Sequence, residues 1–350
     1  MLREHFHFEL PDNLIARQPT AERKGSRLLF LDSAQNNLKH QSFEDLIDHI
    51  QRDDLVIFNN TKVIPARLDG VRFRQSAQGP VQAKIEITLV KPLPNGNWEA
   101  LVKPLRKVKV GEKIIFKKGL IATCIKKLDG KGLLAFSVKG GELDEVLDKI
   151  GDMPLPPYIA SRRPADAQDH LDYQTVWAKH PGAVAAPTAS LHLDEHVLSA
   201  LSNHGVDITF VTLHVGAGTF LPVTVDDIRK HKMHAEWGYV GSKAAQEIKS
   251  TKSKGGRIIP VGTTALRLIE TASLTGMIKP FDGDTEIFIH PGFKFKVTDG
   301  LLTNFHLPKS TLLMLVSAFV GKSELDNIYQ HAIDMSYQFF SYGDASLLFP

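Results

Sequence analysis

The sequence predicts a mixed α/β protein in which a small all-β domain is inserted into a larger α/β domain. Two observations lead to this prediction. Short strand patterns separated by turn signals follow one another between residues 84 and 125, whereas strand and helix patterns alternate from residue 205 to the C-terminus. The β-rich stretch is also basic, because Leu68 to Gly141 contain fifteen Lys and Arg against five acids, a net +10 in a chain of formal charge +3. The remainder therefore carries −7, and 350 residues suffice for about two domains.

The larger domain is expected to comprise residues 1–67 and 152–350. Ser42 stands before apolar residues at positions 43, 46, 47 and 50, which is the pattern of an N-capped amphipathic helix. Residues 55–58 predict a buried strand. A helix over 194–204 is expected to end at Gly205, since glycine commonly terminates helices.

The inserted domain, residues 68–151, is expected to be a small β-barrel. Its short strands are predicted at residues 84–90, 98–102, 107–110, 113–116 and 120–125. The proline-rich segment 153–159 predicts a stiff connector, and the polar residues 161–172 that follow predict a mobile loop.

Composition narrows the class of protein. The single cysteine, Cys124, excludes an internal disulfide, and its apolar neighbours favour a buried hydrophobe over a nucleophile. The most apolar run, Leu312 to Val320, is far shorter than the ~20 residues that cross a bilayer, and the N-terminus shows no signal-peptide core. We therefore expect a cytoplasmic protein without membrane contact.

The basic insert has two interpretations that charge alone leaves open. A patch of one sign suggests a polyanionic partner, usually RNA or DNA. Alternatively, the lysines decorate the outer faces of exposed strands and protect their edges.

The segment Val211–Val223, VTLHVGAGTFLPV, places two glycines after a strand pattern. A dinucleotide-binding fingerprint would need a third glycine where Leu221 stands, with a helix opening there. Pro222 and the β-branched residues after it argue against such a helix. Gly216 and Gly218 are instead expected to let the backbone approach another group closely.

The segment GRIIPVGTTALRLIE, residues 256–270, predicts a strand, a turn at Gly262 and a helix capped by Thr263 or Thr264. The free N–H groups at a helix start attract carboxylate or phosphate, and Arg267 adds charge one turn later. An ordinary capped helix with a surface arginine is the alternative.

His231, His234 and Glu236 form a compact polar group. A spacing of three places the two histidines on one helical face, where they could bind a metal. The strand expected at 235–240 turns Glu236 away from that face, so we favour an acid/base or substrate-orienting role over a metal site.

Eight segments in this order resemble the S-adenosylmethionine:tRNA ribosyltransferase-isomerase family of queuosine biosynthesis: FNNTKVIPARL, MPLPPYI, PGAVAAPTASLH, VTLHVGAGTF, HKMHAEW, VGTTALR, TNFHLPKSTLLMLVSAF and FFSYGD. They run from residue 58 to residue 344. The resemblance covers essentially the whole chain and is weakest in the basic insert. The chain departs from the family pattern at Ser190, Leu193 and Ala265-Leu266. These departures concern the packing near His192 and do not alter the resemblance to the family.

The resemblance implies a fold and a reaction. The fold is a mixed α/β domain with a barrel-like sheet and an inserted β-barrel. The reaction transfers and isomerises the ribosyl group of S-adenosylmethionine, a cosubstrate, onto 7-aminomethyl-7-deazaguanine at the wobble position of tRNA. Epoxyqueuosine forms, and adenine and methionine leave. No permanently bound cofactor or metal is expected, and the enzyme is expected to be a monomer.

The resemblance and the local patterns together define candidate residues. The catalytic candidates are His234 and Glu236, ranked first, with His192 and His306. Substrate binding is assigned to a larger set: Asn60, Thr61, Arg67, His214, Gly216, Gly218, Thr219, Phe220, Thr263, Thr264, Arg267, Asn304, Phe305 and Asp344. Contact with the tRNA backbone is assigned to Lys103, Arg106, Lys107 and Lys109.

Two other classes remain possible on the residues alone. A metal-dependent hydrolase would depend on the His231, His234 and Glu236 group. A non-catalytic tRNA-binding protein would depend on the basic insert. Neither explains the ordered segments.

Overall fold

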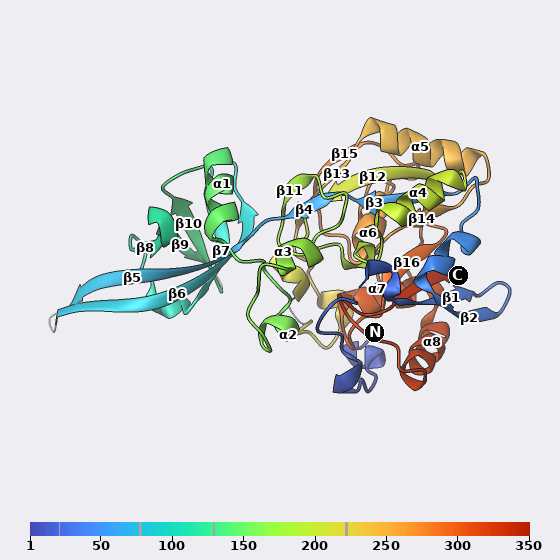
Figure 1. Ribbon diagram of the computed structural model, residues 1–350, viewed down its shortest axis with the longest axis horizontal. Coiled ribbons are helices and arrows are strands. Elements are labelled where there is room, and N and C mark those ends of the chain that lie inside the picture. Colours follow the sequence, from blue (N-terminus) through green and yellow to red (C-terminus); the bar gives the residue numbers. More distant parts are fainter. Residues whose placement is uncertain (21, 77–78, 129, 221–222) are drawn as a thin grey trace. The chain divides into compact units, whose positions relative to one another are not determined.

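The computed structural model describes residues 1–20, 22–76, 79–128, 130–220 and 223–350 (Figure 1). The chain divides into two compact units. The main unit contains Met1–Thr61, Gln174–His180 and Pro187–Pro350, and the barrel unit contains Lys62–Tyr173 and Pro181–Ala186. The domain boundaries expected at residues 68 and 151 lie within the barrel unit, and a division into domains at those residues stays a prediction.

The barrel unit is built around a closed antiparallel barrel in the order β10-β7-β6-β5-β8-β9. Its strands are β5 (Arg67–Ser76), β6 (Gly79–Pro92), β7 (Trp98–Lys103), β8 (Lys113–Phe116), β9 (Ile121–Leu128) and β10 (Lys131–Phe136). Alternate residues such as Ile85, Ile87 and Leu89 are buried, as period-two patterns require. At Gly70 a β-carbon would lie 2.7 Å from the Ile114 and Phe116 side chains, so closure needs glycine there. The mixed α/β class with a small β-barrel is confirmed.

One strand predicted in the insert is wrong. Residues 107–110 do not join the barrel, because Leu105–Lys107 form the 3-10 turn η5 and the chain continues as a loop. The carbonyl of Lys107 accepts a hydrogen bond from Arg72 Nε (3.0 Å), and the N–H of Lys109 donates to Glu112 (2.7 Å). Side chains thus satisfy the backbone groups that a strand partner would have used.

The barrel unit also holds α1 (Gly141–Ile150), α2 (Pro157–Ala160), α3 (Asp169–Asp172) and the 3-10 turn η6 (Lys117–Gly119). Strands β4 (Thr61–Val63) and β11 (His180–Ala183) pair as a two-stranded sheet. Residues 161–172, expected to be a mobile loop, contain α3 and a buried Asp169. Its carboxylate receives two hydrogen bonds of 2.6 Å from Arg163, which hold this segment.

The main unit contains two sheets. The first has the order β14-β3-β12-β13-β15, and the second has the order β16-β17-β1-β2. The bounds are β1 (Arg27–Asp32), β2 (Asn37–Ser42), β3 (Leu55–Asn59), β12 (Asp207–Leu213), β13 (Glu236–Val240), β14 (Ile258–Pro260), β15 (Phe281–Thr285), β16 (Leu301–Asn304) and β17 (Ala345–Phe349). In the first sheet β14, β3 and β12 are parallel, so the segments that follow β3 and β12 meet at one edge.

The long helices of the main unit are α4 (Glu195–Asn203), α5 (Ser242–Ser253), α6 (Thr263–Thr271), α7 (Thr311–Val320) and α8 (Lys322–Asp334). Short 3-10 helices are η1 (Arg3–Phe6), η2 (Asp12–Leu14), η3 (Arg23–Gly25), η4 (Phe43–His49), η7 (Thr188–Ser190), η8 (Ala217–Phe220) and η9 (Ile228–Lys230). The helix predicted after Ser42 is the 3-10 helix η4, with Ser42 and Asp45 forming a capping box. Helix α4 is confirmed, with Asp194 as its cap and Gly205 at positive φ beyond its end.

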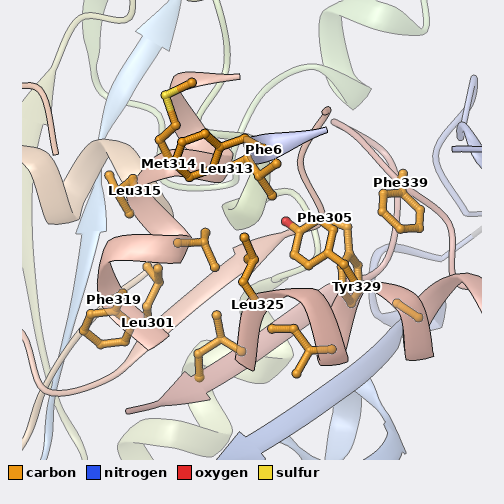
Figure 2. Close-up of a cluster of buried hydrophobic side chains, with 14 of the residues drawn as sticks. Phe6, Leu301, Phe305, Leu313, Met314, Leu315, Phe319, Leu325, Tyr329 and Phe339 are labelled. Carbon is orange, nitrogen blue, oxygen red and sulfur yellow. The ribbon is translucent and has the colours of Figure 1, made fainter. Parts of the chain in front are cut away.

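Helices α7 and α8 form part of a large hydrophobic core (Figure 2). Phe305 lies within it, is fully buried, and has ring centroids 5.2–5.5 Å from those of Tyr329, Tyr337 and Phe339. The sequence analysis assigns Phe305 to substrate binding, but in the structure its fully buried ring has a packing role. Within the described ranges, no helix has both the length and the apolar character needed to cross a membrane.

The core position of Phe305 gives a stability prediction. Phe305→Ala should lower the free energy of unfolding by about 3–5 kcal/mol, because it removes an aromatic side chain and leaves a cavity. Urea denaturation followed by circular dichroism measures this change. Leu274→Ala, at a position 55% exposed, is the control and should change stability by less than about 0.5 kcal/mol. Equal effects of the two substitutions would contradict the packing role.

Candidate active site

Asn59 joins the elements that meet at the end of β3. Its buried side chain accepts hydrogen bonds from the N–H groups of Leu213 (3.0 Å) and Thr61 (3.1 Å). Its amide donates to the Leu213 carbonyl (3.0 Å) and to the Thr264 hydroxyl (3.3 Å). One side chain thus ties β3 to β12 and to the start of α6. Sequence reasoning missed Asn59, although an asparagine ending an apolar strand signals that a side chain must replace strand pairing there.

Asn60, Thr61 and His214 lie beside Asn59. The Asn60 Oδ1 accepts a hydrogen bond from the Thr212 hydroxyl (2.7 Å), and Thr61 Oγ1 lies 2.8 Å from His214 Nδ1. Burial lowers the pKa of His214 to about 4, with a smaller contribution from His180, so this imidazole is neutral at pH 7. The structure therefore brings these three predicted residues together.

Glu236 and Arg267 form a buried ion pair at the start of β13, and their side chains are only 4% and 5% exposed. Glu236 Oε2 accepts a hydrogen bond from Arg267 Nη1 (2.5 Å). Glu236 Oε1 accepts from the Gly216 N–H (3.0 Å) and the Thr219 hydroxyl (3.2 Å). The carboxylate thus holds the loop Gly216–Thr219. The Nε and Nη2 atoms of Arg267 are buried and have no hydrogen-bond partner among the described residues.

Helix α6 begins differently from the prediction. Its N-cap is Gly262, with φ at 86°, and no side chain caps the helix. Thr264 is used elsewhere, since its hydroxyl accepts from Asn59, and Thr263 is buried. The predicted cap by Thr263 or Thr264 is wrong because Gly262 N–H bonds to the Leu302 carbonyl, which fixes the turn one residue earlier. The first turn of α6 keeps its positive dipole end without a side-chain acceptor.

Gly218 leaves room for the ring of His234. A β-carbon at Gly218 would lie 2.4 Å from His234 Cδ2 and 2.6 Å from Cγ, whereas Gly216 has only the Gly218 backbone N near it, at 4.0 Å. The close approach that Gly218 permits is therefore to His234. Residues 217–220 form the 3-10 turn η8, as expected if no Rossmann helix opens here. The side chain of Phe220, predicted to bind substrate, lies outside what the structure describes.

His231 and His234 do not share a helical face. The 3-10 turn η9 ends at Lys230, His231 continues in extended conformation, and its ring packs edge-on against Phe288 at 5.3 Å. The predicted helical arrangement is therefore wrong. Residues 1–20, 22–76, 79–128, 130–220 and 223–350 contain no group of three His, Cys, Asp or Glu placed to hold a metal ion. His234 itself is exposed at the end of this segment.

His192, Asn304 and Asp344 belong to a buried network near the C-terminus. His192 Nδ1 lies 2.8 Å from Ser26 Oγ, and its Nε2 lies 3.1 Å from Asn304 Nδ2. Burial lowers the pKa of His192 to about 4. Asp344 accepts 2.8 Å hydrogen bonds from the backbone N–H groups of Arg27 and Gln338. The hydrogen bonds of His192, Asn304 and Asp344 hold the C-terminal segment, and none of those described goes to Glu236.

His306 and Arg67 each have hydrogen-bond or ion-pair partners of their own. The ring Nε2 of His306 lies 3.0 Å from Thr303 Oγ1, and the backbone N–H of His306 donates to Tyr329 Oη (2.9 Å). Burial lowers the pKa of the His306 imidazole to about 3. Arg67 begins β5 of the barrel unit and pairs with Glu86 at 2.5 Å.

The predicted tRNA contacts lie at the end of β7 and in the turn and loop that follow it in the barrel unit. Lys103, Arg106, Lys107 and Lys109 are all exposed. Glu112 holds this loop through the Lys109 N–H (2.7 Å) and binds Arg74 at 2.6 and 2.9 Å. The hydrogen bond from Arg74 lowers the pKa of Glu112 to about 2, so the anchor is charged at neutral pH.

The chain is similar to known proteins over essentially its whole length. A family described as "Queuosine biosynthesis protein" matches residues 3–348. Two relatives named S-adenosylmethionine:tRNA ribosyltransferase-isomerase are each 59% identical. The Jannaschia protein aligns over 350 residues, with 100% of this chain and 98% of its own covered. The Ruegeria pomeroyi protein aligns over 345 residues, with 99% and 98% covered. The crystal structure of S-adenosylmethionine tRNA ribosyltransferase from Thermotoga maritima is 32% identical, with TM-score 0.55, and 98% and 99% of the two chains are covered.

The fold and these comparisons define an enzyme of the transferase and isomerase type. The chain belongs to the queuosine biosynthesis protein family. The family expected from the ordered segments is thereby confirmed.

The buried pair gives a second prediction. Glu236→Ala should lower the free energy of unfolding by about 3–5 kcal/mol, because it leaves the Arg267 guanidinium buried without its counter-ion. Urea denaturation measures the loss. Lys243→Ala removes an ion pair whose lysine is 88% exposed, and it should cost less than about 1 kcal/mol. The double variant Glu236→Leu with Arg267→Leu should recover part of the stability. If Glu236→Ala costs no more than Lys243→Ala, the pair is not a structural anchor.

Proposed function

We propose that this chain transfers the ribosyl group of S-adenosylmethionine to 7-aminomethyl-7-deazaguanine at the wobble position of tRNA and isomerises it to give epoxyqueuosine. Adenine and methionine are released. The observation that carries the proposal is full-length similarity at 59% identity to relatives named for S-adenosylmethionine and tRNA. We place the enzyme in the cytoplasm, where tRNA is modified, and propose that it acts as a monomer.

The reaction needs a base that removes the proton on the carbon next to the sulfonium. Loss of the purine, attack of the tRNA amine on the ribose and departure of methionine as the epoxide closes complete the change. Glu236 is poorly suited to be this base, because Arg267, Gly216 and Thr219 occupy its carboxylate oxygens. His234 is exposed beside Gly218 and has no hydrogen bond within the described chain. We therefore assign the base to His234 and a positioning role to Glu236.

The methionyl carboxylate of S-adenosylmethionine is assigned to Arg267. Nη1 of Arg267 binds Glu236, which leaves the Nε and Nη2 atoms on the other edge of the guanidinium. This edge matches a carboxylate in bidentate geometry. The uncapped start of α6, at Thr263 and Thr264, adds backbone N–H groups and a positive dipole end. A tRNA phosphate is the competing occupant.

The role of His234 is tested by substitution. His234→Asn should lower kcat by about 10²- to 10⁴-fold, the usual contribution of a positioned acid/base group, and leave the fold intact because the side chain is exposed. Steady-state release of adenine measures kcat. His231→Asn is the matched control, since that ring packs on Phe288, and should retain near wild-type kcat. Equal kcat for both variants would remove His234 from the chemistry.

The basic loop is tested by salt dependence. The double variant Lys107→Glu with Lys109→Glu should weaken tRNA binding and reduce the slope of log Kd against log salt concentration by about 1–2. The slope falls because binding releases about one counterion fewer for each phosphate contact that is lost. Fluorescence anisotropy with labelled tRNA at several salt concentrations measures both. Lys254→Glu with Lys279→Glu makes the same charge change at exposed residues of the main unit. If both double variants behave alike, the loop makes no specific contact.

The whole proposal is tested by incubating the protein with S-adenosylmethionine and tRNA that carries the aminomethyl-deazaguanine base. Free adenine and a nucleoside mass increased by the epoxycyclopentanediol group are expected. If tRNA binds but no adenine appears, the chain is a tRNA-binding protein without this activity.

A further inference from the structure

The main unit carries aromatic side chains on one face of its five-stranded sheet. Along β13, Glu236 bonds to Arg267 of α6, and a β-carbon at Gly238 would lie 2.5 Å from Leu268 of the same helix. Because side chains alternate along a strand, Trp237 and Tyr239 lie on the sheet face opposite α6. Tyr239 is 45% exposed. Strands β12, β13 and β15 run side by side (Figure 1).

Three rings on this face form a ladder, which we define as His214, Trp237 and Tyr239. The His214 and Trp237 ring centroids lie 4.9 Å apart with planes at 29°. Those of Trp237 and Tyr239 lie 6.4 Å apart with planes at 9°. The last two rings are therefore nearly parallel. The exposed ring of Tyr239 suits a nucleobase stacked on its open face.

Each ring of the ladder is held in place by its neighbours. The Trp237 indole donates a hydrogen bond to Asp282 Oδ1 (3.0 Å), and the hydroxyl of Thr61 lies 2.8 Å from His214 Nδ1. The backbone at Gly241 approaches the Tyr239 ring so closely that a β-carbon there would lie 3.3 Å from Cε1. Rings fixed in this way lose little freedom when a ligand stacks on them, which favours binding.

Charges of both signs lie next to the ladder, because Asp284 and Asp282 pair with Trp237 and Tyr239 across β13 and β15. Lys179 and His180 are exposed, and their N–H groups donate to the Asn60 carbonyl at 2.9 and 3.2 Å, beside Thr61. The ladder also begins at His214, two residues before Gly216 of the loop that Glu236 holds. An RNA strand on the ladder would be held mainly by base stacking, with Lys179 as a nearby cation, and would lead toward the proposed base, His234.

We propose that the His214, Trp237 and Tyr239 ladder stacks unpaired bases of the tRNA anticodon loop, next to the nucleotide that is modified. The inference rests on the proposed function, in that it takes tRNA as the substrate. It adds a base-stacking surface on the main unit, which differs in its physics from the electrostatic contact proposed for the basic loop. Aromatic stacking reads single-stranded RNA without requiring a particular sequence.

Binding of two RNAs to the full chain tests the ladder. The first is an unmodified anticodon stem-loop, and the second is the same stem closed by a non-nucleotide linker, which has no loop bases. Wild type should bind the stem-loop more tightly. Tyr239→Ala should weaken stem-loop binding by about five- to a hundredfold, the effect of losing one stacked base, and leave the linker-closed stem unchanged. Tyr239→Phe should retain wild-type affinity, and Leu274→Ala is the exposed-residue control.

Salt dependence and a second variant separate the possible outcomes. The salt slope for Tyr239→Ala should equal that of wild type, because stacking releases no counterions. Trp237→Leu should act like Tyr239→Ala, and thermal denaturation checks that both variants are folded. Wild-type affinity in both variants would overturn the ladder, as would equal weakening for the two RNAs or a raised KM for S-adenosylmethionine with unchanged RNA affinity. If wild type bound neither RNA, the proposed function would fail together with the ladder.

Discussion

The buried ion pair between Glu236 and Arg267 is the constraint on which the candidate active site depends. Taking a carboxylate and a guanidinium out of water costs several kcal/mol per ion, and their attraction offsets this cost only when the remaining acceptors are also satisfied. The Gly216 N–H and the Thr219 hydroxyl satisfy the second carboxylate oxygen. The Glu236 carboxylate, paired with Arg267, therefore holds the loop Gly216–Thr219. Gly218 of this loop leaves the space that the His234 ring occupies.

Environment assigns different roles to residues of the same type. His192 and His306 are held by hydrogen bonds in the interior, and burial lowers the pKa of each to about 4 and about 3. Both are neutral at pH 7 and are suited to structural hydrogen bonding. His234 is exposed beside the loop. Arginines divide in a similar way. The Nε and Nη2 atoms of Arg267 have no partner in the described structure, whereas the same two atoms of Arg74 both bind Glu112.

Predictions from sequence succeeded where a local pattern decides the structure. Alternation of apolar residues located most barrel strands and the strand after His234, and Gly205 marked the end of α4. They failed where a distant partner competes with the pattern. The alternating residues 107–110 form a turn and loop because Arg72 and Glu112 take up backbone groups there, and α6 is started by Gly262 because β16 binds its N–H.

The sequence by itself determined the family, the mixed α/β class and the small set of polar segments in which the site lies, because ordered motifs and hydrophobic periods are local properties of the chain. Only the tertiary structure decided which polar residues meet. Asn59 contacts Leu213 and Thr264, 154 and 205 residues away, and Glu236 contacts Arg267 across 31 residues. Such contacts depend on strand order and on burial, which single-sequence spacing does not encode. The different partners of His192 and His306 have the same origin.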